Sequence, residues 1–263
     1  MYVNDKPGAL ATLALVLFVA TAASIFTQSA VQASKQSELT AQEILARVDE
    51  HASFESAYFE STMIIRSGRR ELVKEMQSYS DGQGNGLVTF TNPADRDTKY
   101  LKLGDELWMY FPDADDLVKI SGHMLRQGFM GSDFSYEDTL QSERFHEVYD
   151  VVLDGMEPCG DALCYVLDAS VKPGVQATYA LRRMWVDAEL FVVRREELMA
   201  AGGRLLKIAE TEKIETIDGR PFSTQVTMRD LLRQNSSTTL VINRAEFDIE
   251  IPEDLFSLRS LMR

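Results

Sequence analysis

Turn signals recur about every ten residues along this chain, and this spacing constrains the fold more than any other feature. Between the signals the chain alternates, so that Phe59, Met63 and Ile65 share one face of a strand, and Leu72 and Met76 share one face of the next. Such a pattern predicts a long antiparallel meander. The turn signals are Ser67-Gly68, Asp81-Gly82, Asn92-Pro93, Gly104-Asp105, Pro112-Asp113, Gly155, Pro173-Gly174, Gly202-Gly203 and Asp218-Gly219.

The number of strands predicts a curved sheet. Beyond the first strands, further ones are expected at residues 98–103, 106–111, 117–121, 146–153, 163–170, 179–187, 190–198, 204–217, 222–230 and 238–247. A sheet of this size must curl or close because of its twist and its edges, so we predict a mainly β (α+β) fold built as a barrel or half-barrel. An incomplete barrel with helices over its mouth leaves an apolar interior that suits a ligand.

Helices are expected at three places. Thr40 and Glu43 form a capping-box pattern ahead of apolar residues at helical spacing, which predicts a helix at the start of the domain. A second helix is expected within residues 121–142 and a short one at 252–258.

The N-terminal segment predicts export. Lys6 precedes a weakly polar to apolar stretch at residues 8–23, and a Ser/Gln-rich segment then ends at Val31-Gln32-Ala33. This pattern is typical of a signal peptide, here residues 1–33 with cleavage after Ala33, and it leaves residues 34–263 as one domain in the periplasm. The alternative is an uncleaved membrane anchor. With no cysteine near the junction, a lipidated N-terminus is not expected.

The charge balance narrows the set of partners. The chain has 27 Lys and Arg against 41 Asp and Glu, a net charge of −14 that disfavours nucleic acid and an electrostatic membrane anchor. Lipid contact is therefore expected to be apolar and membrane contact only transient. Three His and two Cys are too few for structural zinc or haem sites, so no metal and no cofactor are expected.

The two cysteines lie five positions apart. In an oxidising compartment, Cys159 and Cys164 could form a small disulfide at the tip of a hairpin. A redox motif would have two intervening residues and a following helix, whereas here four intervene and strand-like residues follow. A local structural disulfide is the favoured reading.

No catalytic template fits the chain. It lacks the sequence motifs of serine hydrolases, zinc proteases, P-loop enzymes and dinucleotide-binding proteins, so we expect no enzyme activity. The acidic run at residues 113–116 lacks the further ligands of a calcium loop and suits a solvated turn. One alternative stays open, an envelope hydrolase in which His123 would serve Ser121 or Ser132.

Residues 107–138 stand out in composition. The stretch combines Met, Phe, Tyr and Gly without a clean period, which suits an adaptable apolar surface for a ligand of variable shape. The alternative is that these side chains simply fill the core.

This stretch carries a family resemblance. The run Met130-Gly131-Ser132-Asp133-Phe134-Ser135-Tyr136-Glu137-Asp138, preceded by Leu107-Trp108-Met109-Tyr110, resembles the signature of the LolA-like outer-membrane lipoprotein-sorting protein family. The resemblance continues in the family's order at residues 164–167, 185–187, 203–207, 228–230, 238–239 and 251–256. It implies an unclosed antiparallel half-barrel whose concave face is covered by a few helices.

The resemblance also implies a carrier function. A protein of this kind would hold acyl chains of a lipid or lipoprotein in a hydrophobic cavity and pass them from an inner-membrane transporter, for example of the RND type, to an outer-membrane acceptor. Flexible Met and aromatic side chains are expected to line the cavity or form a lid, and the glycines between them are expected to act as hinges. We expect Trp108, Tyr110, Met124, Leu125, Phe129, Met130 and Phe134 in the cavity or lid, with Gly128 and Gly131 as hinges. The alternative from another class is a scaffold subunit of a cell-envelope transport system, without lipid cargo and with its interior filled.

Overall fold

Most of the described chain is β-strand. The computed structural model describes residues 39–139 and 145–262. Its strands are β1 (Ser56–Ser67), β2 (Arg70–Asp81), β3 (Gly86–Phe90), β4 (Lys99–Leu103), β5 (Glu106–Phe111), β6 (Asp116–Ile120), β7 (Tyr149–Cys159), β8 (Ala162–Val171), β9 (Leu181–Asp187), β10 (Val193–Met199), β11 (Leu205–Ile217), β12 (Arg220–Asp230) and β13 (Ser236–Phe247). Its helices are α2 (Ala41–Ala52), α3 (Phe145–Val148) and α4 (Leu258–Leu261), with short 3-10 turns η1 (Pro112–Ala114), η2 (Gly122–Arg126), η3 (Phe129–Gly131) and η4 (Glu137–Thr139).

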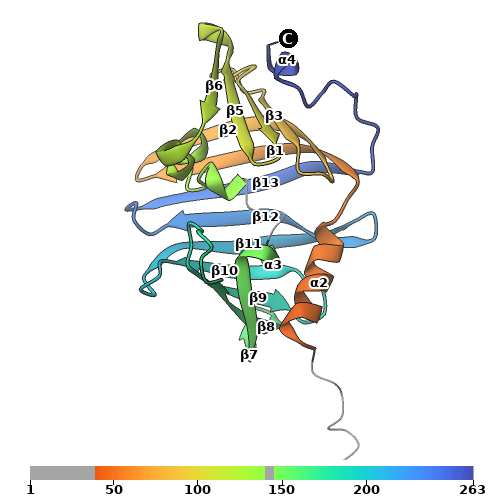
Figure 1. Ribbon diagram of the computed structural model, residues 1–263, viewed down its shortest axis with the longest axis vertical. Coiled ribbons are helices and arrows are strands. Elements are labelled where there is room, and N and C mark those ends of the chain that lie inside the picture. Colours follow the sequence, from red (N-terminus) through yellow and green to blue (C-terminus); the bar gives the residue numbers. More distant parts are fainter. Residues whose placement is uncertain (1–38, 140–144, 263) are drawn as a thin grey trace, which may run out of the picture. The chain divides into compact units, whose positions relative to one another are not determined.

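The strands form one antiparallel sheet with two open edges. Their order is β6-β5-β4-β3-β2-β1-β13-β12-β11-β10-β9-β8-β7, so the first strand pairs with the last in the middle of the sheet (Figure 1). Bulges interrupt the register in β1–β13 and at several later pairs, which increases twist and bending. The predicted unclosed half-barrel is confirmed. The sheet lies within a unit that spans Thr40–Arg263, and the predicted signal peptide at 1–33 lies outside the described residues.

The strand bounds predicted from sequence agree with the structure to within a few residues, except that β3 was not predicted and that the strand expected at 146–153 is β7. There Phe145–Val148 forms the helical turn α3, and β7 begins only at Tyr149. The ring of Phe145 stacks on that of Tyr149, which ties the turn to the strand it introduces. Local side-chain packing therefore delays the start of the strand.

A crossover connects the two edges of the sheet. Since β6 and β7 are the edge strands, the chain between them has to connect opposite edges of the sheet, and we call the described residues 121–139 and 145–148 the crossover. The helix predicted within 121–142 is found as the 3-10 turns η2, η3 and η4. Met130 has a left-handed backbone (φ 50°) that interrupts a regular helix at this point.

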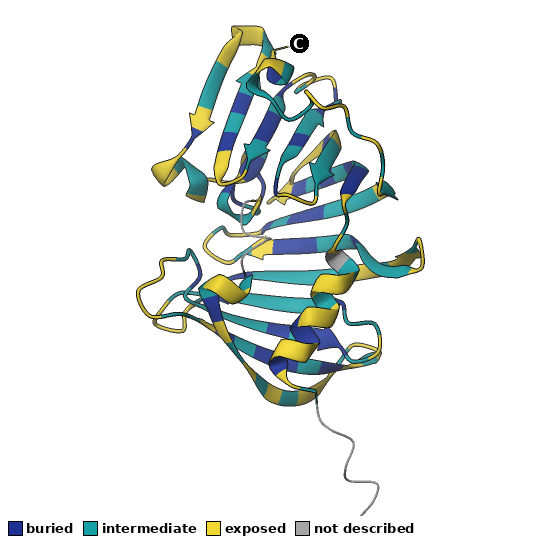
Figure 2. Ribbon diagram, turned by 45° about the vertical axis from the view of Figure 1, so that its right-hand side comes forward, coloured by how far each residue is buried: buried dark blue, intermediate teal, exposed yellow. Residues whose placement is uncertain are grey.

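The register defines two faces of the sheet. Cross-strand partners point to the same side, so Ile65, Thr238 and Met228 share one face, which we call the inner face. Helix α2 contacts β7 and β12, and Figure 2 shows buried and exposed residues alternating along its turns. Ile44 of α2 is fully buried. The predicted capping box is present, because Thr40 accepts a hydrogen bond from the Glu43 backbone and Glu43 accepts one from the Thr40 backbone.

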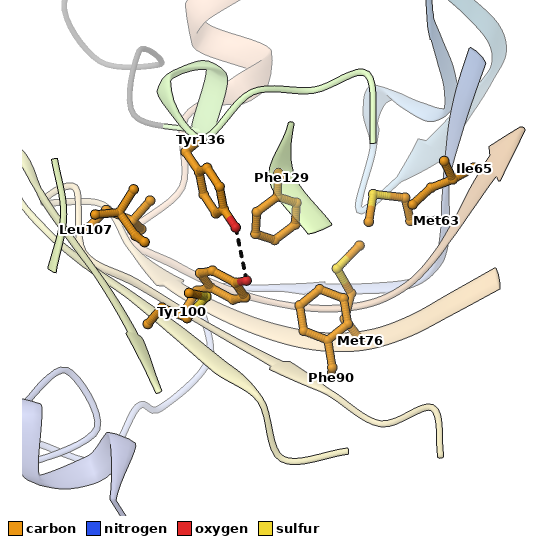
Figure 3. Close-up of a cluster of buried hydrophobic side chains, with 10 residues drawn as sticks. Met63, Ile65, Met76, Phe90, Tyr100, Leu107, Phe129 and Tyr136 are labelled. Atoms are coloured by element: carbon orange, nitrogen blue, oxygen red, sulfur yellow. Dashed lines mark hydrogen bonds between the residues drawn. The ribbon is translucent and has the colours of Figure 1, made fainter. Parts of the chain in front are cut away.

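One half of the inner face is filled by the crossover. Phe129 and Tyr136 of the crossover pack onto Phe90 and Tyr100, and the Tyr100 and Tyr136 hydroxyls lie 3.3 Å apart (Figure 3). The same cluster contains buried residues from β1, β2, β5 and β6, namely Met63, Ile65, Met76, Leu107, Met109 and Ile120. This half of the interior is a packed core.

The C-terminal segment covers part of the opposite, outer face. Leu261 is fully buried in a cluster with Leu87 and Leu101, against which Leu255 and Phe256 also pack. The helix expected at 252–258 begins only at Leu258, because the Ser257 side chain accepts a hydrogen bond from the Ser260 backbone and so fixes the start there.

Removing the ring of Phe90 tests the packed half of the interior. Phe90→Ala is expected to lower the free energy of unfolding by about 3–5 kcal/mol, because Phe90 is fully buried between Tyr100 and Phe129. Urea denaturation of the purified protein measures it. Phe111→Ala, at a side chain that is 36% exposed, is the matched control and is expected to cost well under half as much. Equal losses would mean that the crossover does not pack as described.

Candidate functional site

A cavity of about 380 Å³ lies on the half of the inner face that the crossover leaves unfilled. Helix α2 covers it on one side, and strands β9 to β12 line it on the other. Its lining side chains are Leu45, Val48, Asp49, Phe134, Asp138, Phe145, Tyr179, Arg182, Met184, Val193, Glu196, Leu198, Ala209 and Met228. Most of them are apolar, and the size lies within the range of about 300–1,000 Å³ found for ligand pockets.

An ion pair stands in the wall of this cavity. The Arg182 guanidinium lies 2.6 Å from Glu196 Oε1 and packs over the rings of Phe145 and Tyr149. Burial alone would lower the pKa of Arg182, but the attraction and hydrogen bonding of Glu196 and Tyr149 together outweigh burial and the pKa is raised. The arginine therefore stays charged while its stem and the two rings present apolar surface.

A second polar group fixes the end of the crossover. Asp138 accepts hydrogen bonds from the Tyr179 hydroxyl at 2.7 Å and from Lys207 Nζ at 2.8 Å. Its side chain and that of Lys207 are only 12% and 10% exposed. Burial raises the pKa of Tyr179 and the Asp138 carboxylate raises it further, so the phenol remains a donor.

The middle of the crossover is tied to β13 and to the turn before it. Thr238 Oγ1 donates to Asp133 Oδ2 at 2.6 Å and accepts from the Asp133 backbone at 2.9 Å, and both residues are almost fully buried. Arg233 donates to the carbonyl oxygens of Ser132 and Gly131 at 2.6 and 3.1 Å. These bonds hold Phe134, the residue after Asp133, against the cavity.

The residues predicted for a cavity or lid fall into three groups. Phe134 lines the cavity. Four others belong to the packed cluster on the other half of the inner face, namely Met124, Leu125, Phe129 and Met130. Trp108 and Tyr110 lie on the outer face with the C-terminal segment, because they alternate with Met109, which points inward. The structure therefore does not bring the seven together.

The two predicted hinge glycines have different surroundings. At Gly128, which pairs with Ser135 in an isolated bridge, a Cβ atom would lie 2.3 Å from the Ser132 carbonyl oxygen. Any side chain there would force the backbone apart. Gly131 has a φ of +81° and open space around it. Motion about either residue stays a prediction.

The remaining sequence candidates are placed as follows. Cys159 and Cys164 form a disulfide at the β7–β8 hairpin. Ser132 is fully buried and its hydroxyl donates to the Phe134 carbonyl, whereas His123 is exposed. In the acidic run, Asp115 accepts a hydrogen bond from Tyr110. Across the described ranges, no group of three or more His, Cys, Asp or Glu is arranged to hold a metal ion.

Sequence reasoning missed the polar anchors and the contribution of α2. Asp133 and Asp138 lie in the run that carries the family resemblance, yet nothing in their spacing identifies Thr238 or Lys207 as their partners. Leu45 and Val48 show helical periodicity, which signals a buried face without saying what it covers. Within residues 39–139 and 145–262, none of the helices has the length and apolar character that a membrane span needs.

Comparison with known proteins places the chain among similar folds. A family model described as an uncharacterized protein matches residues 82–263. A DUF1329 family protein from Desulfovibrio piger is 28% identical, with a TM-score of 0.77, and the match covers 83% of this chain and 96% of that one. The LolA superfamily protein NE2245 from Nitrosomonas europaea is 25% identical, with a TM-score of 0.70 and coverage of 85% and 100%.

A third solved structure supports the fold alone. It is described as an outer membrane lipoprotein-sorting protein domain from Vibrio parahaemolyticus, and it is 22% identical with a TM-score of 0.74 over 84% of this chain and 97% of that one. No curated protein matches the chain.

Neutralising Asp138 tests the anchor of the crossover. Asp138→Asn is expected to lower the free energy of unfolding by about 3 kcal/mol, because it leaves the buried Lys207 ammonium without its counter-charge. Urea denaturation measures the loss, and limited proteolysis followed by mass spectrometry should locate new cleavage in the crossover. Glu71→Gln removes the partner of Arg66 in a pair that is about half exposed, and its denaturation midpoint should stay unchanged. An unchanged midpoint for Asp138→Asn as well would contradict the anchoring role.

Proposed function

The chain belongs to the family matched over residues 82–263 and has the LolA-like fold, and on this premise we propose that it is a carrier of lipid or lipoprotein acyl chains. It would bind an acyl chain in the cavity beneath α2 and pass it between membrane partners on the way to the outer membrane. One of the similar solved structures is described as a lipoprotein-sorting protein domain, which is the source of this substrate class.

The observation that carries the proposal is the unfilled half of the inner face. A cavity of about 380 Å³ with mainly apolar walls remains there, whereas side chains of the crossover pack into the other half. Each methylene removed from water is worth about 0.8 kcal/mol, so a long acyl chain gains much by entering such a space. The cavity can therefore shield cargo passively, without chemistry.

The walls also suggest how cargo enters. Two side chains of α2, Leu45 and Val48, and two from the crossover, Phe134 and Phe145, form the cover of the cavity, whereas the strands form its floor. The cavity is partly open to solvent, and an outward movement of α2 would widen it for a long acyl chain. The sheet itself can stay rigid.

Loading and release would be driven by partners. The sequence has no nucleotide-binding loop, so the free energy for loading would come from an inner-membrane transporter, with RND-type systems as the candidate class. Delivery would then run downhill in affinity to an outer-membrane acceptor. No catalytic step is required.

Export to the periplasm is part of the proposal. The N-terminal pattern is typical of a cleaved signal peptide, and a disulfide between Cys159 and Cys164 suits an oxidising compartment. Residues 34–263 would be the mature carrier.

Filling the cavity tests the proposal. The protein is purified from the periplasm of a host that makes the full chain, and bound lipid is identified by native mass spectrometry and lipid extraction. We expect co-purifying phospholipid or acylated peptide with the natural sequence and its loss in Ala209→Trp, because Ala209 lines the cavity and an indole would occupy it.

The matched control is the neighbouring residue. Ile208→Trp places the same ring on the opposite face of β11, since Ile208 pairs with Arg229 and Glu197 there, and it should keep its cargo. A protein that carries no acyl chain, and takes up none when offered palmitoylated peptide, would overturn the proposal. The scaffold role would then be favoured.

A further inference from the structure

The turn between β12 and β13 presents two adjacent exposed leucines. Leu231 and Leu232 are 47% and 62% exposed, among the more exposed large apolar side chains of the described chain. Both follow directly on Asp230, where β12 ends, and no strand pairing covers them. Adjacent apolar side chains at an exposed loop tip form a small apolar patch that a partner surface can cover.

This turn is hydrogen-bonded to three other segments at the same end of the sheet (Figure 1). Gly68 of the β1–β2 hairpin donates to the Asn235 carbonyl at 2.9 Å, and the Leu231 backbone donates to the Leu206 carbonyl at 2.8 Å, just after the β10–β11 turn. Arg233 binds the crossover carbonyls of Gly131 and Ser132. We call residues 66–71, 121–132, 200–204 and 229–236 together the rim.

The rim has the opposite charge to the rest of the chain. It contains seven arginines and two acidic residues, in a chain whose net charge is −14. The seven are Arg66, Arg69, Arg70, Arg126, Arg204, Arg229 and Arg233. All but Arg233 are exposed.

Most of this charge is not neutralised locally. In the described part of the chain, Arg66 pairs with Glu71 and Arg229 with Glu210, and Arg233 faces Asp133 at 3.6 Å. The other four arginines have no ion-pair partner among the described residues. Arginine binds phosphate with two parallel hydrogen bonds, so exposed guanidinium groups around an apolar tip favour phosphate-bearing surfaces.

The rim also lies beside the cavity. Met228 lines the cavity and is three residues before Leu231, and Ala209 lines it three residues after Leu206. At about 3.3 Å per strand residue, the leucines are therefore only about 10 Å along the sheet from the cavity wall. The rim therefore lies close to the cavity wall formed by β11 and β12.

We propose that the rim is the surface by which this protein docks on anionic phospholipid membranes, with Leu231 and Leu232 entering the headgroup region and the arginines binding lipid phosphates. The arginines are spread over four turns around a protruding apolar tip, which matches a broad anionic plane better than a groove-bound peptide. The inference deepens the proposed carrier function, because it names the membrane surface at which the cavity would exchange cargo.

Vesicle flotation tests the docking, with protein that is purified from the periplasm of a host expressing the full chain. We expect binding to vesicles of phosphatidylethanolamine with phosphatidylglycerol, weak binding to pure phosphatidylcholine, and loss of binding at high salt. Leu231→Asp combined with Leu232→Asp should lower the partition coefficient roughly tenfold or more. Arg69→Glu should lower it roughly fivefold.

Two controls match these variants in exposure and charge. Leu163→Asp changes a leucine that is 49% exposed at the β7–β8 hairpin, and Arg259→Glu reverses an exposed arginine in α4. Both should bind vesicles like the natural sequence, and thermal melts should show all variants folded. The docking proposal would be overturned by no vesicle binding, by equal binding to neutral vesicles, or by rim variants that bind normally. A rim that binds only an acidic protein would also contradict it.

The readout is separate from that of the carrier function. Flotation needs no cargo, whereas the cavity variant Ala209→Trp reports on cargo and should still float. Vesicle binding without any co-purified acyl chain would support membrane docking by the rim and contradict the carrier proposal. A co-purified acyl chain without vesicle binding would support the carrier proposal and contradict docking.

Discussion

The pairing of the first strand with the last decides how this molecule is arranged. Because β1 and β13 form eleven residue pairs in the middle of the sheet, the two edges fall to β6 and β7. Those strands are consecutive in the chain but lie at opposite ends of the sheet. The crossover between them has to span the sheet, and it lies where a curved sheet is concave. The strand order therefore places the crossover over the inner face. A cavity can form only on the part of this face that the crossover does not fill.

The crossover divides the interior because its two halves are held differently. Its first half buries Phe129 against β3 and β4, where this ring contacts three others, those of Phe90, Tyr100 and Tyr136. Its second half is held by polar bonds, from Asp133 to β13 and from Asp138 to Lys207, and it places Phe134, Asp138 and Phe145 against the cavity. Apolar packing fills one half of the inner face, and polar anchors keep the other half from collapsing.

Period-two alternation and turn chemistry were enough to predict most of the strands and the curvature of the sheet, because these are local properties, but the five-residue strand β3 was missed. The β1–β13 pairing joins residues almost two hundred positions apart, and local signals say nothing of it. The assignment of Trp108 and Tyr110 to the cavity could have been avoided, since alternation already places them opposite Met109. The polar residues of the 130–138 run were overlooked for another reason: their partners lie on distant strands. The basic rim could not be predicted from the net charge of −14 for the same reason, because its arginines come from four separate turns that meet only in the folded chain.

The separation of a basic rim from an otherwise acidic surface determines how the protein would orient at an anionic membrane. A uniformly acidic protein is repelled by an anionic membrane in every orientation, whereas one with a basic rim is attracted in a single orientation and repelled in all others. The rim is adjacent to the wall of the cavity at Met228, so the attractive orientation also brings the cavity to the bilayer. The acidic remainder limits the residence time, because only a small area is favourably placed. An exchange of cargo between two membranes needs both properties, contact with the cavity facing the lipid and prompt departure afterwards.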